Sequence, residues 1–120
     1  MSPLHFSLTD DDPTSLFLVE RLLKRKFPGA EVSCFECPIK TLEHVHRGGT
    51  NALITDHGMG PMTGTELIQQ LRAENVAIPM VMISNNPEAA AEAMAAGADD
   101  FVDKADINRL PEVLKRMLAV

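Results

Sequence analysis

Tryptophan and tyrosine are absent from this chain of 120 residues, whose aromatic content is five phenylalanines. A flavin site, which commonly stacks its ring on such side chains, therefore finds little support. No apolar run approaches the ~20 residues that a membrane span needs, and no basic-then-apolar signal segment opens the chain. The two cysteines and the missing signal together predict a reducing, cytoplasmic setting.

Positive charge is also scarce, because 11 lysines and arginines face 17 aspartates and glutamates, giving a net charge of −6. This deficit argues against direct binding to nucleic acid or to an anionic membrane, but it leaves room for a cation site. Hydrophobic residues make up 45% and charged residues 23%, which excludes disorder, collagen and coiled coil. We therefore expect residues 1–120 to form one globular domain.

Short apolar stretches alternate along the chain with longer amphipathic ones, a pattern typical of strands and helices in turn. Strands are expected at 4–9, 31–35, 52–55, 79–84 and 101–102. The first helix is expected from Asp12-Pro13 to Phe27, the second over 39–47 and the last over 108–118. The third is expected to begin at the capping-box residues Thr63 and Glu66. The fourth is the alanine stretch, which Asn86-Pro87 caps and Gly97 ends. Five strands alternating with five helices imply an α/β domain with a mainly parallel sheet and helices on both faces.

Polar residues follow the expected strands at the points where the strands end. Asp10 to Asp12 follow the first strand, Asp56 the third and Lys104 the fifth, while Ser84 ends the fourth. Because parallel strands bring their carboxyl ends to one edge of the sheet, these side chains should converge. Crowded carboxylates raise a pKa or attract a cation. Mg²⁺ or Mn²⁺ suits such oxygen ligands, and the ammonium and hydroxyl groups can hold phosphate oxygens.

Four motifs at these strand ends resemble the receiver domain of two-component response regulators, the CheY-like domain. The resemblance covers essentially the whole chain, with the motifs in the family's order and at its spacing, and it implies a flavodoxin-like doubly wound fold with strand order 2-1-3-4-5. The motifs are Thr-Asp-Asp-Asp-Pro at 9–13, Ile-Thr-Asp at 54–56 followed by Met-Thr-Gly at 62–64, Met-Ile-Ser at 82–84, and Gly-Ala-Asp-Asp-Phe-Val-Asp-Lys at 97–104.

The resemblance implies a phosphorylation site. Asp56 matches the residue that accepts a phosphoryl group from the phosphohistidine of a histidine kinase. Asp10 and Asp11 match the acidic pair that holds Mg²⁺, one directly and one usually through water. With Asp56 itself, the backbone carbonyl two residues later, here that of Gly58, completes the expected ligand set.

The resemblance also implies a conformational switch. Ser84 matches the hydroxyl that turns toward the phosphoryl group, and Lys104 matches the phosphate-binding lysine. Phe101 stands at the family's aromatic switch position, three residues before that lysine. Phosphorylation is then expected to move Ser84 and Phe101 inward together and to reshape the face built by the fourth helix, the fifth strand and the last helix.

The implied partners are a sensor histidine kinase or phosphotransfer protein, and a downstream protein or fused output domain, with a homodimer as a further possibility. Whether the domain stands alone or belongs to a larger regulator or hybrid histidine kinase stays open. Two other functions also stay open at this point. One is a receiver-like interaction module that is not phosphorylated, and the other is a Mg²⁺-dependent phosphohydrolase with Asp56 as nucleophile.

The sequence departs from the family's usual pattern in four ways. Ala105 replaces the proline that commonly follows the lysine, so the preceding peptide bond is expected to be trans. Asn85 is larger than the usual Ala or Gly after the switch hydroxyl, which could narrow access to the acceptor. Gly60 and Pro61 exchange the usual order of Pro and Gly, and Gly58 lacks a side chain that many relatives carry there, which should open the approach for water.

Several other residues have simpler structural interpretations. Asp12 is expected to cap a helix rather than bind metal, and Phe101 to be a partly buried core aromatic whatever its switch role. Cys34 and Cys37 have redox-motif spacing, but we expect no helix N-terminus beside them to lower a thiol pKa. His57 adjoins the expected acceptor, yet neighbours on a strand point to opposite sides, which makes it structural.

Overall fold

The computed structural model describes residues 3–58 and 60–120; Met59, in the expected loop at 58–62, lies outside them. Five strands form one sheet whose neighbours all pair in parallel, in the order β2-β1-β3-β4-β5. This confirms the flavodoxin-like fold. The strands are β1 (His5–Thr9), β2 (Glu31–Phe35), β3 (Ala52–Asp56), β4 (Met80–Ser84) and β5 (Asp100–Asp103).

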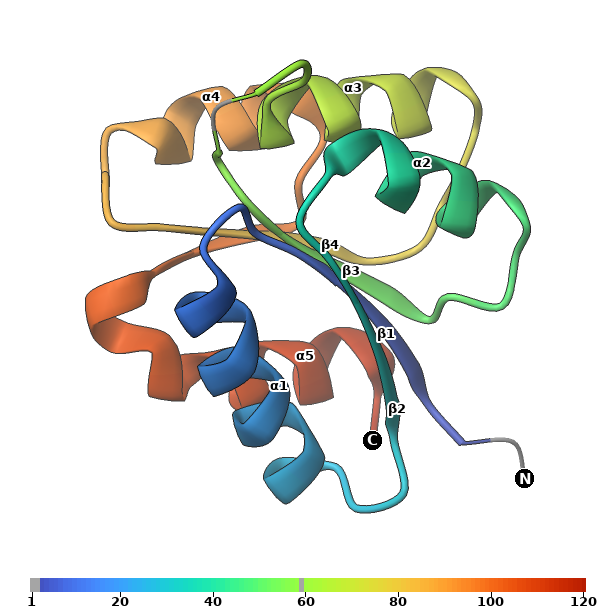
Figure 1. The fold of residues 1–120 in the computed structure, drawn as a ribbon, viewed down its shortest axis with the longest axis vertical. Coiled ribbons are helices and arrows are strands. Elements are labelled where there is room, and N and C mark those ends of the chain that lie inside the picture. The colour runs from blue at the N-terminus through green and yellow to red at the C-terminus, as the bar shows by residue number, and fades with distance from the viewer. Residues whose placement is uncertain (1–2, 59) are drawn as a thin grey trace.

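Helices cover both faces of the sheet (Figure 1). One face carries α1 (Pro13–Lys26) and α5 (Leu110–Leu118), and the other carries α2 (Pro38–His46), α3 (Gly64–Ala73) and α4 (Ala89–Ala96). A 3₁₀ segment that the sequence did not predict, η1 (Lys104–Arg109), joins β5 to α5. Within the described residues, every helix is too short or too polar to cross a membrane.

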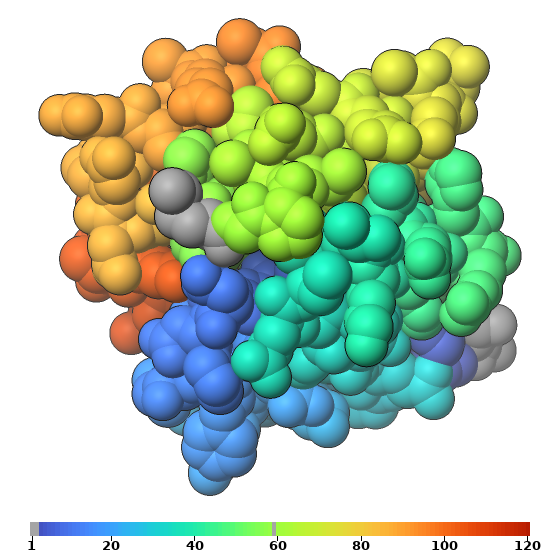
Figure 2. Space-filling model, turned by 45° about the horizontal axis from the view of Figure 1, so that its top comes forward, coloured from blue at the N-terminus to red at the C-terminus, as the bar shows by residue number. Residues whose placement is uncertain are grey.

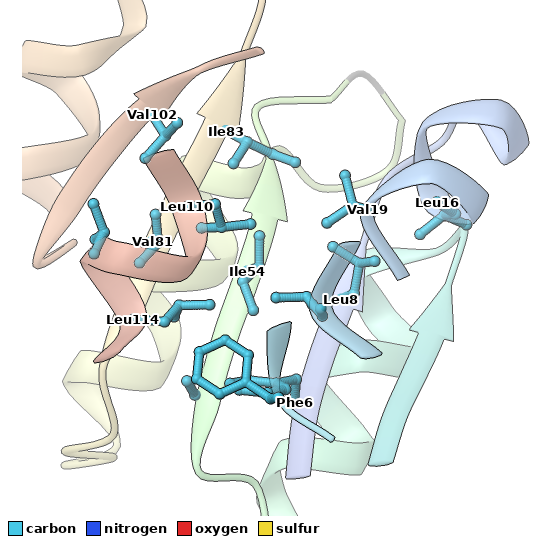
Figure 3. Packing of buried hydrophobic residues seen from close by; sticks show 14 residues of the cluster. Phe6, Leu8, Leu16, Val19, Ile54, Val81, Ile83, Val102, Leu110 and Leu114 are labelled. Atoms are coloured by element: carbon cyan, nitrogen blue, oxygen red, sulfur yellow. The ribbon is translucent and has the colours of Figure 1, made fainter. Parts of the chain in front are cut away.

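The central strands are buried on both faces, and their side chains alternate between two hydrophobic cores, one on each face of the sheet. Toward α1 and α5, the strand residues Phe6, Leu8, Ile54, Val81 and Ile83 pack with Leu110 and Leu114 (Figure 3). Toward α2, α3 and α4, the intervening residues Leu53, Met80 and Met82 pack with Leu67, Leu71 and Ala93. Because successive side chains point to opposite faces, each central strand packs against the helices on both sides of the sheet.

Capping residues set the helix ends near the sheet edge. Asp12 accepts a hydrogen bond from the amide of Thr14 at 3.0 Å, with Pro13 as the first helical residue, as predicted. Thr63 and Glu66 form the expected reciprocal capping box at the start of α3. The alanine helix starts later than its expected cap, because α4 begins after Glu88 and Asn86 instead accepts a bond from the Glu88 amide.

Candidate functional site

Three carboxylates meet where β1 and β3 end. One oxygen each of Asp10, Asp11 and Asp56 can be chosen so that all lie within 4.8 Å of one another. Figure 2, in which the top of Figure 1 is turned forward, shows the blue start of α1, the green segment after β3 and the teal start of α2 gathered at this edge. The topology therefore brings together acids that are 45 residues apart in the sequence.

Lys104 neutralises part of this charge from the start of η1. Its Nζ donates to Oδ2 of Asp10 at 2.8 Å and lies 3.3 Å from Oδ1 of Asp56. The Asp10 side chain is 1% exposed, and its other oxygen accepts a hydrogen bond from the amide of Asp12 at 2.9 Å. Both oxygens of Asp10 thus already have protein donors, and Asp56 has contacts of its own with Lys104 and with the backbone amide of His57.

The pKa of Asp56 is raised by its burial and by a neighbouring acid. Burial, and then the charge of Asp10, raise the pKa of Asp56, while Lys104 and the backbone amide of His57 work in the opposite direction. Burial alone would lower the pKa of Lys104, but its hydrogen bond to Asp10 and the charges of Asp10 and Asp56 raise it. One ammonium therefore does not balance the acids fully, and the site favours an additional cation.

The space beside the acids suits an ion rather than an organic molecule. We call it the acidic hollow; its volume is about 10 Å³, near the lower limit for holding one water molecule. Oxygen donors from carboxylates and a backbone carbonyl are the ligands that Mg²⁺ prefers, so the chemistry of the residues fits this ion. The hollow is lined by Thr9, Asp10, Asp11, Glu36, Pro38, Thr55, Asp56 and Gly58.

Glu36 is a member of this hollow that the sequence analysis missed. It follows β2, whose last residue, Phe35, accepts a hydrogen bond from the Asp10 amide at 3.1 Å, so the two strand ends are held together. The signal was present in the sequence, because Glu36 directly follows the expected strand 31–35, just as Asp10 and Asp56 follow theirs. Glu36 adds a fourth carboxylate to the wall of the hollow.

Two glycines shape the loop around Asp56. Gly58 has a φ of +55°, a left-handed conformation that suits glycine, and it lines the hollow. Gly64 begins α3, and its amide donates to the carbonyl of His57 at 2.7 Å. A Cβ on Gly64 would overlap the backbone carbonyl oxygen of Asp56. The glycine of the Met-Thr-Gly motif therefore lets α3 begin directly against the end of β3.

The two switch candidates lie on the neighbouring strands β4 and β5. Ser84 is 5% exposed and ends β4, and its hydroxyl accepts a hydrogen bond from the amide of Asn86 at 3.0 Å. Phe101 pairs with Met82 in the sheet and packs, partly buried, against the core beneath α4. Phe101 is thus a partly buried core aromatic, as the sequence predicts.

The departures from the family pattern have local structural consequences. The Lys104–Ala105 bond is trans, as expected, and the amide of Ala105 donates to the side chain of Asp103 at 2.9 Å as η1 begins. Asn85 is exposed and lies away from the acidic hollow, in the wall of a groove between α1 and η1. Bulk at Asn85 is therefore placed beside Lys104 rather than among the acids.

One expectation about the cysteines was wrong. Cys37 is the N-cap residue of α2, so a helix N-terminus does adjoin the pair, because Pro38 starts the helix one residue earlier than predicted. The Cys37 side chain makes no capping hydrogen bond. Burial, together with Glu20, raises the pKa of the Cys34 thiol to about 11, which keeps it protonated and argues against redox chemistry.

His57 points toward α4, in keeping with its expected structural role. Its Nε2 lies 3.7 Å from a carboxylate oxygen of Glu92.

Residues 6–115 match the family described as the response regulator receiver domain. The chain is 32% identical over 99 residues to the response regulator protein TodT of Pseudomonas putida, covering 81% of this chain and 43% of that protein. It is also 30% identical over 117 residues to the two-component response regulator ARR17 of Arabidopsis thaliana, covering 84% and 75% respectively. The chain thus spans less than half the length of TodT.

Solved structures share the fold over nearly the whole chain. The receiver domain of the Francisella response regulator 1452 superposes with a TM-score of 0.86 at 18% identity, covering 97% of both chains. A CheY-like receiver domain protein from Methanospirillum hungatei gives a TM-score of 0.86 at 24% identity, covering 98% of this chain and 95% of the other. At these identities the likeness concerns the fold.

Proposed function

This chain belongs to the response regulator receiver family, and on that premise we propose that Asp56 accepts a phosphoryl group from the phosphohistidine of a histidine kinase or phosphotransfer protein. The observation that carries the proposal is the contact of one ammonium with two acids: Lys104 lies 2.8 Å from Asp10 and 3.3 Å from Asp56. An ammonium beside a nucleophilic carboxylate can hold the oxygens of an incoming phosphoryl group.

The proposed transfer requires positioning more than covalent chemistry. An oxygen of Asp56 attacks phosphorus in line, the phosphorus–nitrogen bond of the donor breaks, and its electron pair stays with the histidine ring. Lys104 shifts from the carboxylate of Asp56 to the phosphoryl oxygens, while Asp10 keeps it in place. A Mg²⁺ ion held by Asp11, Asp56 and the Gly58 carbonyl, with Asp10 outside its direct ligands, would neutralise further charge on the transferring group.

We also propose that the aspartyl phosphate, which adds about two negative charges, drives a switch. The Ser84 hydroxyl, now bonded to the Asn86 amide, turns to the phosphoryl group, and Phe101 moves inward behind it. The outer face of α4, β5 and α5 then changes for a downstream protein, a fused output domain or a second copy. A phosphorylated sample in which Ser84 and Phe101 keep their present positions would contradict the switch.

Receiver domains are signalling modules rather than enzymes, and a phosphorelay with a histidine kinase is the setting that we propose, in the cytoplasm. Two other functions lead to different outcomes in the same assay. An interaction module would take up no phosphoryl group. A phosphohydrolase would use Asp56 repeatedly.

The experiment is incubation with acetyl phosphate and Mg²⁺, followed by intact-mass measurement and phosphate assay. We expect one adduct of about 80 Da, the mass of a phosphoryl group, in the parent chain and in Asp12→Asn, and none in Asp56→Asn. Asp12→Asn is the matched control because Asp12 caps α1 at the same edge. An unmodified parent chain would favour the interaction module, and steady release of phosphate over many turnovers would favour the hydrolase.

A further inference from the structure

The position of the Lys104 ammonium depends on how the backbone of Lys104 is held. Lys104 is the first residue of η1 and directly follows β5. Its Nζ lies 2.8 Å from Asp10 and 3.3 Å from Asp56. Lysine has a flexible four-carbon stem, so the direction in which its Cβ leaves the backbone decides which groups the ammonium can reach. A residue that fixes this direction takes part in building the site.

Asp103 closes a hydrogen-bonded turn around Lys104. Its Oδ1 accepts a hydrogen bond from the amide of Ala105 at 2.9 Å, which joins the residues on the two sides of Lys104. Asp103 itself has an extended backbone, with φ −65° and ψ 133°, and η1 begins at the next residue. Aspartate side chains stabilise turns by bonding the amide two residues on. The bond therefore holds the peptide groups before and after Lys104 in one arrangement.

The sheet fixes the first residue of this turn. Asp103 ends β5 and lies in register with Ser84, the last residue of β4. Val102, which precedes Asp103, is buried in the core on the side of α1 and α5. Because Asp103 cannot move without the sheet, its bond to the Ala105 amide ties the backbone of Lys104 to the strand ends that carry the acids.

The carboxylate of Asp103 does not compete for the ammonium. Among residues 3–58 and 60–120, the acids within 4.0 Å of the Lys104 Nζ are Asp10 and Asp56. Asp103 is adjacent in sequence, but its oxygen is bonded to a backbone amide instead. A free carboxylate beside Lys104 would offer the ammonium another partner. The turn thus directs Lys104 and also occupies an acid that could draw it away.

We propose that Asp103 is a positioning residue, whose hydrogen bond to the Ala105 amide sets the Lys104 ammonium beside Asp10 and Asp56. The inference rests on the proposed phosphorylation for its purpose, because Lys104 there holds phosphoryl oxygens, but the placement of the ammonium can be measured without a phosphoryl donor. The bond needs an amide hydrogen at residue 105. Alanine supplies this hydrogen, and a proline at 105 would not.

A crystal structure of Asp103→Ala is the first test. We expect the Lys104 Nζ to lie beyond hydrogen-bonding distance of Asp10 and Asp56 in this variant, with the five strands unchanged. Two probes, Mn²⁺ and beryllofluoride with Mg²⁺, report the same displacement in solution, because the ammonium repels a cation in the acidic hollow and attracts an anion at Asp56.

The two probes should respond to Asp103→Ala in opposite directions. We expect Mn²⁺, titrated by electron paramagnetic resonance, to bind about threefold more tightly once the ammonium has left. Beryllofluoride, followed by fluorine NMR, should bind about fivefold more weakly. A substitution that merely loosened the strand ends would weaken both probes together.

Two control variants separate the hydrogen bond from the charge. Asp103→Asn keeps an accepting oxygen, so it should bind both probes as the parent chain does. Asp106→Ala removes the same charge from an exposed position on η1 and should also leave both affinities unchanged. In an Ala105→Pro background, which lacks the amide hydrogen, adding Asp103→Ala should have no further effect.

Failure of this inference differs from failure of the proposed function. A parent chain that acetyl phosphate does not modify, together with a displaced Lys104 in Asp103→Ala, would keep the positioning role and remove the phosphorylation. A Lys104 Nζ that remains bonded to Asp10 in Asp103→Ala would overturn the positioning role. So would a parallel weakening of both probes, or an Asp103→Asn variant that behaves like Asp103→Ala.

Discussion

The acidic hollow and the groove lie close to the same lysine but differ in size and charge. The hollow, of about 10 Å³, is walled by carboxylates from the ends of β1, β2 and β3. The groove, of about 700 Å³, is walled by leucines and arginines of α1 and by η1. Lys104 connects the two: it lines the groove, and its ammonium binds Asp10 and Asp56, which line the hollow.

Lys104 therefore lies at the boundary between an acidic site and a mainly apolar groove. The strand ends place acids close enough together to favour a cation, and the small hollow beside them leaves room for an ion alone. The helix beside them has exposed apolar residues, and its Arg21 and Arg25 pair with no acid in the part of the chain that the structure describes. Changes at the boundary and on either side of it should therefore have effects of different size and kind.

The largest effect is expected from Lys104→Met, which keeps an apolar side chain of similar length and removes the ammonium from Asp10 and Asp56. Asp10, 1% exposed, would lose its charged partner. Leaving a buried charge uncompensated costs about 3 kcal/mol of unfolding free energy. Urea denaturation at neutral pH without divalent ions should show this loss, and added Mg²⁺ should restore part of it.

Lys26→Met removes the same charge from an exposed position on α1 and should change stability by less than about 0.5 kcal/mol. A Lys104→Met variant as stable as this control would mean that the lysine does not hold the hollow together.

Gly64→Ala should have the next largest effect, about 2 kcal/mol of destabilisation, because the new Cβ overlaps the carbonyl of Asp56 and forces the start of α3 away from β3. The displaced Asp56 should also bind divalent ions more weakly. Denaturation and ion titration measure the two effects.

Gly29→Ala is the control, since Gly29 has a φ of +86° but open space around it. It should cost about 1 kcal/mol for backbone strain and leave ion binding intact. Equal ion affinities in the two variants would contradict the packing role of Gly64.

Asp56→Asn should stabilise the ion-free protein, by on the order of 1 kcal/mol. The folded state raises the pKa of Asp56 through burial and the charge of Asp10. A carboxyl group whose pKa is raised by folding favours the folded state at low pH and loses this contribution as the pH rises through its folded pKa. The gain from asparagine should therefore be largest near neutral pH and should shrink toward pH 4.

Denaturation in a chelator from pH 4 to 7 measures this difference. If the stability gained by Asp56→Asn instead increased as the pH falls, folding would not raise the pKa of Asp56.

Glu36→Gln should produce the smallest effect, a two- to fivefold loss of Mn²⁺ affinity with little change in stability. Glu36 lines the hollow but is exposed, so it acts on a bound ion through water and a screened charge. Glu43→Gln, on exposed α2 surface, is the control with the same change of net charge. Equal affinities in the two variants would remove Glu36 from the site.

Much of the hollow could be predicted because topology alone brings the ends of parallel strands together. Asp10, Asp56 and Lys104 were assigned to one edge from their positions after expected strands, and the structure places them in contact. Caps such as Asp12 and Thr63 were predictable since they act on amides two or three residues away.

Features that depend on long-range packing could not be read from local patterns. Arg72 donates to the carbonyls of Val76, Ile78 and Gly97 and to the Asp99 carboxylate, which fastens α3 to the ends of β4 and α4. In the sequence, Arg72 is only a basic residue near the end of an expected helix, and nothing local indicates these contacts. The groove likewise depends on how η1 lies against α1, and η1 itself was unexpected.

A crystal structure with Mg²⁺ and beryllofluoride tests the central claim most directly. The account predicts beryllium on an oxygen of Asp56, Lys104 within hydrogen-bonding distance of a fluoride, and the metal about 2.0–2.1 Å from oxygens of Asp11, Asp56 and Gly58. Metal and fluoride bound elsewhere, with Lys104 still holding Asp10 and Asp56 as it does now, would contradict it.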